Sequence, residues 1–258
     1  MNTFQRRSRL VWTESRYEIL KHLRTPAFIV PTLTFPVLFY LFFGVAMGGR
    51  GMGSGATMSV YLIATYGAFG VIGTALSSFG VSLALERGQG LLQLKQATPM
   101  PLYAYIFAKL ASATLFSSIV TIALFVMGTA FGGAQLDVSQ FAMLFATLVV
   151  GTIPFALLGL TVGYVVSAEA AVAVINVLYL PMGFLSGLWV PIDFMPAMVK
   201  QIATFLPAFH FGQLALSVID MPIRGHAALH AVALIGFSLI FLATAIAAYR
   251  FDRRKNYA

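Results

Sequence analysis

Long uncharged stretches, each close to the length of a membrane-spanning helix, make up most of the chain. Asp, Glu, Lys and Arg are absent from seven of them, at residues 25–49, 51–85, 110–136, 138–168, 170–192, 201–219 and 225–249. A helix needs about 20 apolar residues to cross the hydrocarbon core of a bilayer. The pattern predicts six spans, at about 26–47, 57–85, 101–131, 139–166, 171–189 and 228–248.

The stretch 201–219 is the exception among the seven. It is short, and it contains Pro207, His210 and Gln213, while Pro191 and Pro196 precede it. Proline removes a backbone donor, and irregular backbone at membrane depth persists only where protein or water satisfies it. We expect residues 190–219 to form short helices that dip into the outer leaflet and return, with His210 hydrogen-bonded among them.

The composition agrees with an integral membrane protein. Of 258 residues, 59% are hydrophobic and only 9% are charged, whereas a soluble domain of ordinary composition has about 25% charged residues. A soluble enzyme and a disordered chain are therefore poor interpretations. The chain has no cysteine, which excludes disulfides, zinc–thiolate sites and iron–sulfur clusters.

The distribution of basic residues predicts the orientation. With six spans, 13 of the 16 Lys and Arg residues fall on one face, and loops rich in such residues stay in the cytoplasm. Both termini are therefore expected in the cytoplasm, in a plasma membrane of the bacterial inner-membrane type. Lys109, in the third span, is counted with this face and is expected near the surface.

Residues 1–25 precede the first span, and 26–258 form a single transmembrane domain. The first segment has a two-sided helical pattern, with Trp12, Ile19, Leu20 and Leu23 on one side and Glu14, Glu18 and Lys21 on the other. Such a pattern is typical of a helix lying at the membrane surface. The alternative is a basic tail that only fixes the topology.

A search for catalytic chemistry finds little. There is no GxxxxGK[ST] phosphate loop, no paired-carboxylate site and no metalloprotease or hydrolase motif. Glu86 and Glu169 lie at span ends rather than at mid-membrane, which disfavours a proton-driven pump. His226 and His230 share a helix face, but no third ligand is evident, so a metal site is disfavoured. The chain is expected to be no enzyme and to hold no cofactor of its own.

Small residues at four-residue spacing allow helices to approach closely in a membrane. Such residues in the first and second spans predict a homodimer interface formed by helices one, two and five. The candidates are Gly44, Gly48, Gly70, Gly73 and Thr74.

Two segments carry a resemblance to a known family. Residues 86–101, ERGQGLLQLKQATPMP, resemble the loop after the second span of ABC type-2 permeases, E-R-E-x-G-T-x-x-x-L-x-x-T-P. Gly88 stands where the family has an acid, and Leu91 where it has Thr. Residues 186–196, SGLWVPIDFMP, resemble the family's outer re-entrant segment, G-x-aromatic-x-P-[IL]-x-x-[LM]-P, which continues to a third proline.

The resemblance implies a half-transporter that pairs with a second copy and with two separate ATPase subunits, which bind ATP and Mg. Residues 86–101 would form the coupling helix seated in a cleft of the ATPase. The implied coupling residues are Glu86, Arg87, Gly90, Leu91, Leu92, Leu94, Thr98 and Pro99. The implied outer gate comprises Gly187, Trp189, Pro191, Pro196 and Pro207.

The transport path would then lie near the dimer axis. Candidate lining residues are Thr65, Tyr66, Phe69, Asn176 and Tyr179, whose alternative role is helix packing. An aromatic path without charged rings disfavours ions and favours export of an amphipathic or hydrophobic drug, lipid or lipid-linked product. Two alternatives stay open: a polysaccharide-exporting permease of the same family, and a membrane scaffold or assembly subunit. No nucleic-acid partner is expected.

Overall fold

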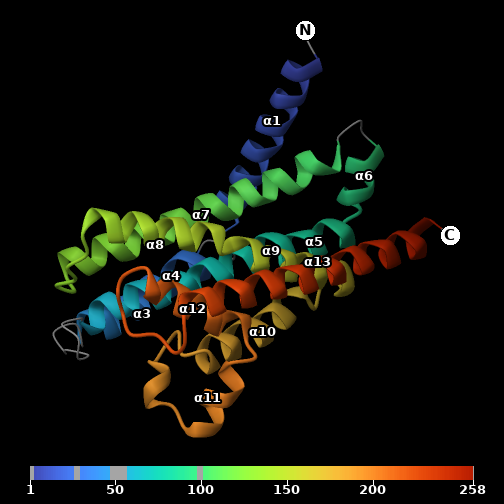
Figure 1. Ribbon diagram of the computed structural model, residues 1–258. Helices are drawn as coiled ribbons and strands as arrows, with labels where there is room; N and C mark the ends of the chain where they lie inside the picture. Colours follow the sequence, from blue (N-terminus) through green and yellow to red (C-terminus); the bar gives the residue numbers. More distant parts are fainter. Residues whose placement is uncertain (1–2, 26–29, 47–56, 98–100, 258) are drawn as a thin grey trace.

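One long helix lies at the centre of the bundle (Figure 1). In this computed structural model, which describes residues 3–25, 30–46, 57–97 and 101–257, α4 (Met58–Leu76), η3 (Ser77–Val81) and α5 (Ser82–Gly88) follow one another without a break. Every residue of α4 is buried. Its apolar residues occur on all sides and are mixed with Gly, Ala, Ser and Thr, a composition that suits a helix enclosed by other helices.

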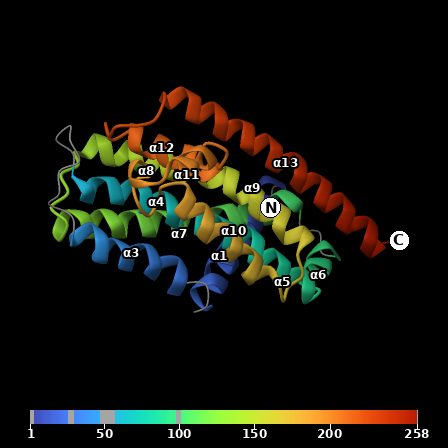
Figure 2. The same ribbon diagram turned by 90° about the horizontal axis from the view of Figure 1, so that it is seen from below.

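Other helices enclose α4. The first predicted span contains η1 (Val30–Thr34), α3 (Phe35–Phe39) and η2 (Tyr40–Val45). The third predicted span is α7 (Leu102–Ala130). The fourth consists of α8 (Val138–Val150) and α9 (Thr152–Val165), which meet at Gly151. The last helix, α13 (Ala227–Tyr257), begins beside α12 and crosses the bundle along α9 to the C-terminus (Figure 2).

Four helices within the described residues are long and apolar enough to cross a membrane: 58–88, 103–130, 138–165 and 227–253. They match four of the six predicted spans. The first and fifth predicted spans correspond to shorter apolar helices, Thr32–Val45 and Ala171–Leu185. The all-helical membrane fold is thus confirmed, and the number of six crossings stays a prediction.

The segment after the fifth helix is broken into short pieces. After α10 (Ala171–Leu185) come η4 (Ile192–Phe194), α11 (Ala197–Ala203) and α12 (Pro207–Ser217). Pro196 directly precedes α11, and Pro207 is the first residue of α12, where a missing N–H costs a helix nothing. No continuous helix crosses this part of the described chain. Its depth in the bilayer stays a prediction.

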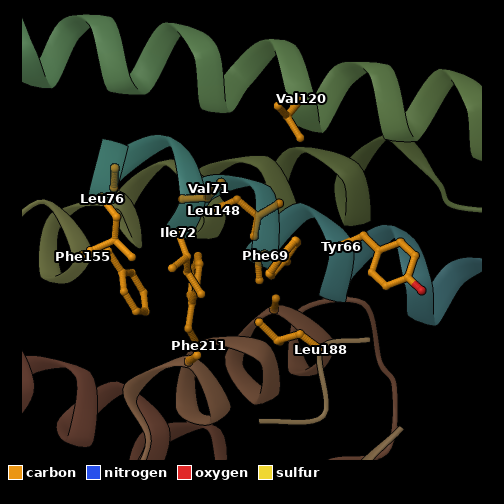
Figure 3. Packing of buried hydrophobic residues seen from close by; sticks show 14 of the residues in the cluster. Tyr66, Phe69, Val71, Ile72, Leu76, Val120, Leu148, Phe155, Leu188 and Phe211 are labelled. Carbon is orange, nitrogen blue, oxygen red and sulfur yellow. The ribbon is translucent and has the colours of Figure 1, made fainter. Parts of the chain in front are cut away.

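The hydrophobic core forms where α4 meets α9 and α12 (Figure 3). Ile72 and Leu76 of α4 point toward Phe155 and Phe211, whose ring centroids are 5.5 Å apart. Phe211 is fully buried, and close packing of such side chains is what holds helices together in a membrane. α12 is therefore a structural part of the bundle, although it belongs to the segment between two predicted spans.

The C-terminal part of the N-terminal helix α1 (Thr3–Leu23) lies against α7. The N-terminal part of α1 projects away from the bundle (Figure 1). Ser15, Glu18 and His22 are buried, whereas Trp12 and Tyr17 are exposed. The predicted helix is present, and its polar side is the one that contacts the bundle. Its exposed aromatic side suits a membrane interface.

Candidate coupling site and transport path

The predicted coupling segment is a short helix at one end of the bundle. After α5 ends at Gly88, the chain turns at Gly90, whose φ of +71° favours glycine, and continues as α6 (Leu91–Ala97). Leu91 is 41% exposed and Leu94 65%, whereas Leu92 is only 7% exposed and packs inside the chain. Two of the three predicted leucine anchors are therefore open to a partner. Thr98 and Pro99 lie outside the described residues.

A buried cluster of charges lies where α1, α5 and α7 meet. Lys109 of α7 donates from Nζ to Glu18 Oε1 at 2.8 Å, to Ser82 Oγ at 2.8 Å and to Glu86 Oε1 at 3.2 Å. Lys21 of α1 also donates to Glu86. Lys109 is 0% exposed, so the chain encloses it completely, and its place near the membrane surface stays a prediction. Its ammonium group is drawn inward because two buried carboxylates need a counter-charge.

The cluster joins three separate parts of the chain. Glu18 belongs to α1, Glu86 to the end of the second span, and Lys109 to the third span. Tyr105, one turn before Lys109, donates its hydroxyl to Glu86 Oε2 at 2.7 Å. The two carboxylates, Lys109 and Lys21 balance in charge and lie within hydrogen-bonding distance of one another, which is the condition for retaining ions in a buried site.

The burial of Glu18 and His22 on α1 shifts the pKa values of both side chains. Burial raises the pKa of the Glu18 carboxyl, but the ammonium groups of Lys109 and Lys21 outweigh it and leave the pKa below its ordinary value. Burial lowers the pKa of His22 to about 4, so this imidazole is neutral at pH 7. His22 Nδ1 lies 2.9 Å from Ser112 Oγ of α7. Both effects keep the interface between α1 and α7 charge-balanced at neutral pH.

Two further ion pairs hold the coupling segment. Lys95 of α6 pairs with Glu14 of α1, and Glu86 and Glu14 raise the pKa of Lys95 against the lowering effect of burial. Arg87 pairs with Asp252 of α13. The Arg87 guanidinium also donates to the carbonyls of Gly163, at 2.8 Å, and Val166, at 3.3 Å.

The segment is thereby attached to the first helix, to the last helix and to the end of the fourth. Glu86 and Arg87 are the first two of the implied coupling residues. Glu86 contacts the N-terminal helix, whereas Arg87 contacts α13.

Aromatic side chains gather where the first, second and fifth helices meet. Phe69 stacks on Tyr179 with ring centroids 4.2 Å apart and meets Trp189 edge-on at 5.3 Å. Phe39 lies 5.2 Å from Trp189 and 6.2 Å from Tyr66. Three predicted path residues therefore come together with one predicted gate residue. All carry apolar rings, which suits contact with an apolar solute.

The other two predicted path residues lie apart. The Thr65 hydroxyl donates to the Tyr61 carbonyl within α4 and is buried, whereas Asn176 is exposed on the outer side of α10. Thr65, Tyr66 and Phe69 all lie in the core of one chain. In this conformation they face their own neighbours, and a role in transport stays a prediction.

Two of the predicted gate residues, Gly187 and Trp189, accept hydrogen bonds from the second span. Tyr61 donates its hydroxyl to the Gly187 carbonyl at 2.9 Å, and Tyr66 donates to the Trp189 carbonyl at 3.2 Å. Gly187 adopts φ of +76°, which favours glycine, and Pro191 starts the turn into η4. These hydroxyls fix the beginning of the 190–219 segment on the aromatic cluster.

The predicted dimer glycines have neighbours within one chain. A side chain added at Gly70 would lie 2.6 Å from Val120 Cγ1, and one at Gly73 2.6 Å from Tyr179 Oη. Thr74 donates to the Gly70 carbonyl at 2.7 Å, and Gly44 packs on Tyr40 of its own helix. Their small size serves intrachain packing, and pairing of two copies through them stays a prediction. Gly48 lies outside the described residues.

Comparison with known proteins agrees with this arrangement. The sequence profile described as "ABC-2 type transporter" matches residues 9–220. The chain belongs to this family. It is also 28% identical over 199 residues, covering 77% of this chain and 81% of the other, to a Bacillus subtilis (strain 168) protein named "Putative transport permease YvfS". The chain is therefore a membrane permease, and the family implies a partner ATPase subunit.

The match spans both the coupling segment and the broken helices up to α12. Sequence reasoning missed the buried lysine cluster. The available signal was a lone lysine, Lys109, within a long apolar run, together with Glu18 and Glu86, two of only eight acidic residues in the chain.

The neutral His22 predicts a pH dependence of stability. A histidine whose folded pKa lies below its unfolded value of about 6.5 makes unfolding easier as pH falls, because the unfolded chain binds the proton more readily. Between pH 6.5 and about 4, the stability is expected to fall by about 3 kcal/mol from this residue. Thermal unfolding in detergent should show His22→Gln losing much of this fall, and the exposed His226→Gln keeping it. An equal fall in both variants would contradict the assignment.

Proposed function

We propose that the chain is the permease subunit of an ATP-driven exporter, with two copies acting with two ATPase subunits. ATP and Mg bind in the ATPase, because this sequence contains no phosphate loop. The cargo is an amphipathic or hydrophobic compound such as a drug, a lipid or a lipid-linked product. The membrane is a plasma membrane of the bacterial inner-membrane type, with both termini in the cytoplasm. The 13-to-3 bias of basic residues supports this orientation.

The observation that carries the proposal is the pair of exposed leucines on α6. Leu91 and Leu94 lie on α6, which is bonded to α1 through Lys95 and Glu14, while Arg87 of the preceding α5 is bonded to α13. Exposed apolar side chains at the cytoplasmic end of a membrane protein favour a protein partner. A cleft in the ATPase would bury them, as interface anchors are buried.

Ion pairs connect α6 and the preceding α5 to other helices of the bundle, so a force applied to α6 reaches them. Lys95 transmits a displacement to α1 through Glu14, and Arg87 transmits it to α13 through Asp252. Glu86, at the end of the second span, moves with Lys109 of the third. Charge-assisted hydrogen bonds are about twice as strong as neutral ones. A movement of α6 therefore displaces these helices together rather than one at a time.

The aromatic cluster supports the choice of cargo. Phe39, Phe69, Tyr179 and Trp189 offer stacked and edge-on ring surfaces between the first, second and fifth helices. All four side chains in these ring contacts are uncharged. Separation of the first and fifth helices during a transport cycle would expose these rings to a solute, and such surfaces favour apolar or amphipathic molecules over ions.

Two copies would meet through the first and fifth helices. Leu41 and Phe42 on η2, and Val177 and Leu178 on α10, are exposed apolar side chains. These helices are also the two shorter apolar ones in the described chain, and a short helix gains from packing against a neighbour in a bilayer of greater thickness. The second helix packs against both of them within one chain.

Coupling is tested by changing the exposed leucines. The double variant Leu91→Asp/Leu94→Asp should lose co-purification with the ATPase subunit and at least about tenfold of transport-linked ATP hydrolysis, as expected when interface anchors worth about 1.4 kcal/mol or more are removed. Gln93→Asp adds the same kind of charge to α6 without removing an apolar side chain and should stay near wild type. Retained ATPase binding in the double variant would contradict the proposal.

Pairing is tested by cysteine cross-linking, which is clean because the chain contains no native cysteine. Phe42→Cys and Val177→Cys should give cross-linked dimers in membranes, since both positions lie on the proposed interface. Leu239→Cys, on an equally apolar and exposed surface of α13, should remain monomeric. Dimers formed only through Leu239→Cys would place the interface on the opposite side of the bundle.

A further inference from the structure

Two buried histidines join the broken segment to the last helix. His210 lies in α12 and His230 in the first turns of α13, and both are buried. Their Nδ1 atoms are 3.0 Å apart, a distance at which two ring nitrogens share one hydrogen. The contact links residues 20 positions apart, on two helices that pack along each other.

The other nitrogen of each ring faces a backbone carbonyl. His210 Nε2 lies 3.0 Å from the Thr204 carbonyl oxygen, and His230 Nε2 lies 2.7 Å from the Arg224 carbonyl oxygen. A carbonyl oxygen only accepts hydrogen bonds, so each Nε2 must carry a hydrogen for these contacts to be bonds. The carbonyl that each ring faces therefore fixes its tautomer.

Counting hydrogens gives the charge of the pair. A neutral imidazole carries one N–H, and the two Nε2 atoms use both hydrogens that two neutral rings possess. The two Nδ1 lone pairs would then face each other at 3.0 Å without a hydrogen between them. A third proton, placed between the Nδ1 atoms, satisfies all three contacts and gives the pair one positive charge.

The surroundings contain no carboxylate bonded to either ring among the described residues. Asp193 is paired with Arg224, and Asp220 accepts a hydrogen bond from Gln140. Lys200 of α11 donates to the Asp193 carbonyl at 2.8 Å, and His226 is exposed one turn before His230.

The rings nearest the pair are aromatic. Phe209 meets His230 edge-on at 5.8 Å, and Phe237 lies 6.0 Å from His210. A positive charge on the pair would therefore be stabilised chiefly by the two carbonyls and by sharing between the rings.

We propose that His210 and His230 bind one proton between them and hold α12 against α13 in that singly protonated state. A second proton would place two N–H groups and two charges face to face, which opens the contact. Loss of the shared proton leaves two lone pairs facing each other, which weakens it. The contact is strongest at an intermediate pH, and α12 separates from α13 on acidification.

The pair lies away from the coupling segment. α13 begins beside α12 and runs to the end of the bundle where α6 lies (Figures 1 and 2). In the topology proposed above, the pair is on the outer side and senses the pH outside the cell. Phe211, one residue after His210, is fully buried in the core, so release of α12 would loosen that core beside the predicted gate.

The proton count is measured by nitrogen NMR of histidine-labelled, purified full-length chain in detergent. His226→Gln leaves three of the four histidines and removes the exposed one. From about pH 6 to pH 8, both Nε2 atoms of the pair should be protonated, and the Nδ1 atoms should share a proton with shifts between those of free and protonated nitrogen. Two independent neutral rings, each with an unprotonated Nδ1, would overturn the proposal.

A second measurement follows the coupling between the two residues. Unfolding temperatures of wild type, His210→Gln, His230→Gln and the double variant, from about pH 5 to about pH 9, give the interaction by a double-mutant cycle. The interaction should be largest at intermediate pH and vanish or reverse in acid, and His226→Gln should keep the wild-type profile. A pH-independent interaction would overturn the proposal. Neither experiment uses an ATPase or a cargo, so a negative result at the histidine pair is distinct from failure of the transport proposal.

Discussion

The buried ammonium group of Lys109 makes the interaction on which the α6 end of this permease depends. Removing such an ion from water costs several kcal/mol, which only close counter-charges and hydrogen bonds offset. Glu18, Glu86 and Ser82 supply them. Because these residues come from α1 and from the end of the second span, neither element can leave its place without exposing an uncompensated charge in the bundle.

This constraint also positions the coupling segment. α5 ends two residues after Glu86, and Gly90 then turns the chain into α6. The segment is therefore held at its base by the buried cluster, at its side by Lys95 and Glu14, and across the bundle by Arg87 and Asp252. Only the outer side of α6 remains open to a partner, and there Leu91 and Leu94 are exposed. These attachments are what the proposed coupling to an ATPase requires.

Much of the fold was predictable because hydropathy reports the length of a helix in a membrane. The charge-free stretches give the second, third, fourth and sixth helices to within a few residues at most ends, although α13 continues to Tyr257, well past the expected end at 248. Prolines at 196 and 207 give the breaks between η4, α11 and α12. Hydropathy does not report which neighbours a helix has, so the complete enclosure of α4 was not foreseen.

Sequence patterns likewise do not report which side chains lie against the small residues or which groups pair with Lys109. Gly70 and Gly73 were assigned to a contact between copies because small residues permit close approach. Val120 and Tyr179 of the same chain lie against them, and pairing of copies through these glycines stays a prediction. Lys109 was counted with the basic face of the membrane domain, and its burial against two carboxylates was not foreseen. Its carboxylate partners lie 91 and 23 residues away, and no local pattern connects positions so far apart.

A double-mutant cycle between Lys109 and Glu18 tests the role of the buried cluster most directly. Lys109→Met leaves Glu18 and Glu86 with Lys21 as the nearest remaining cation and should lower the unfolding free energy in detergent by about 3–5 kcal/mol. Glu18→Gln added to it restores the balance of charge, so the double variant should be more stable than Lys109→Met alone, with a coupling of more than about 1 kcal/mol. If the two losses simply add, the buried ammonium does not hold α1 to the bundle, and other contacts position the coupling segment.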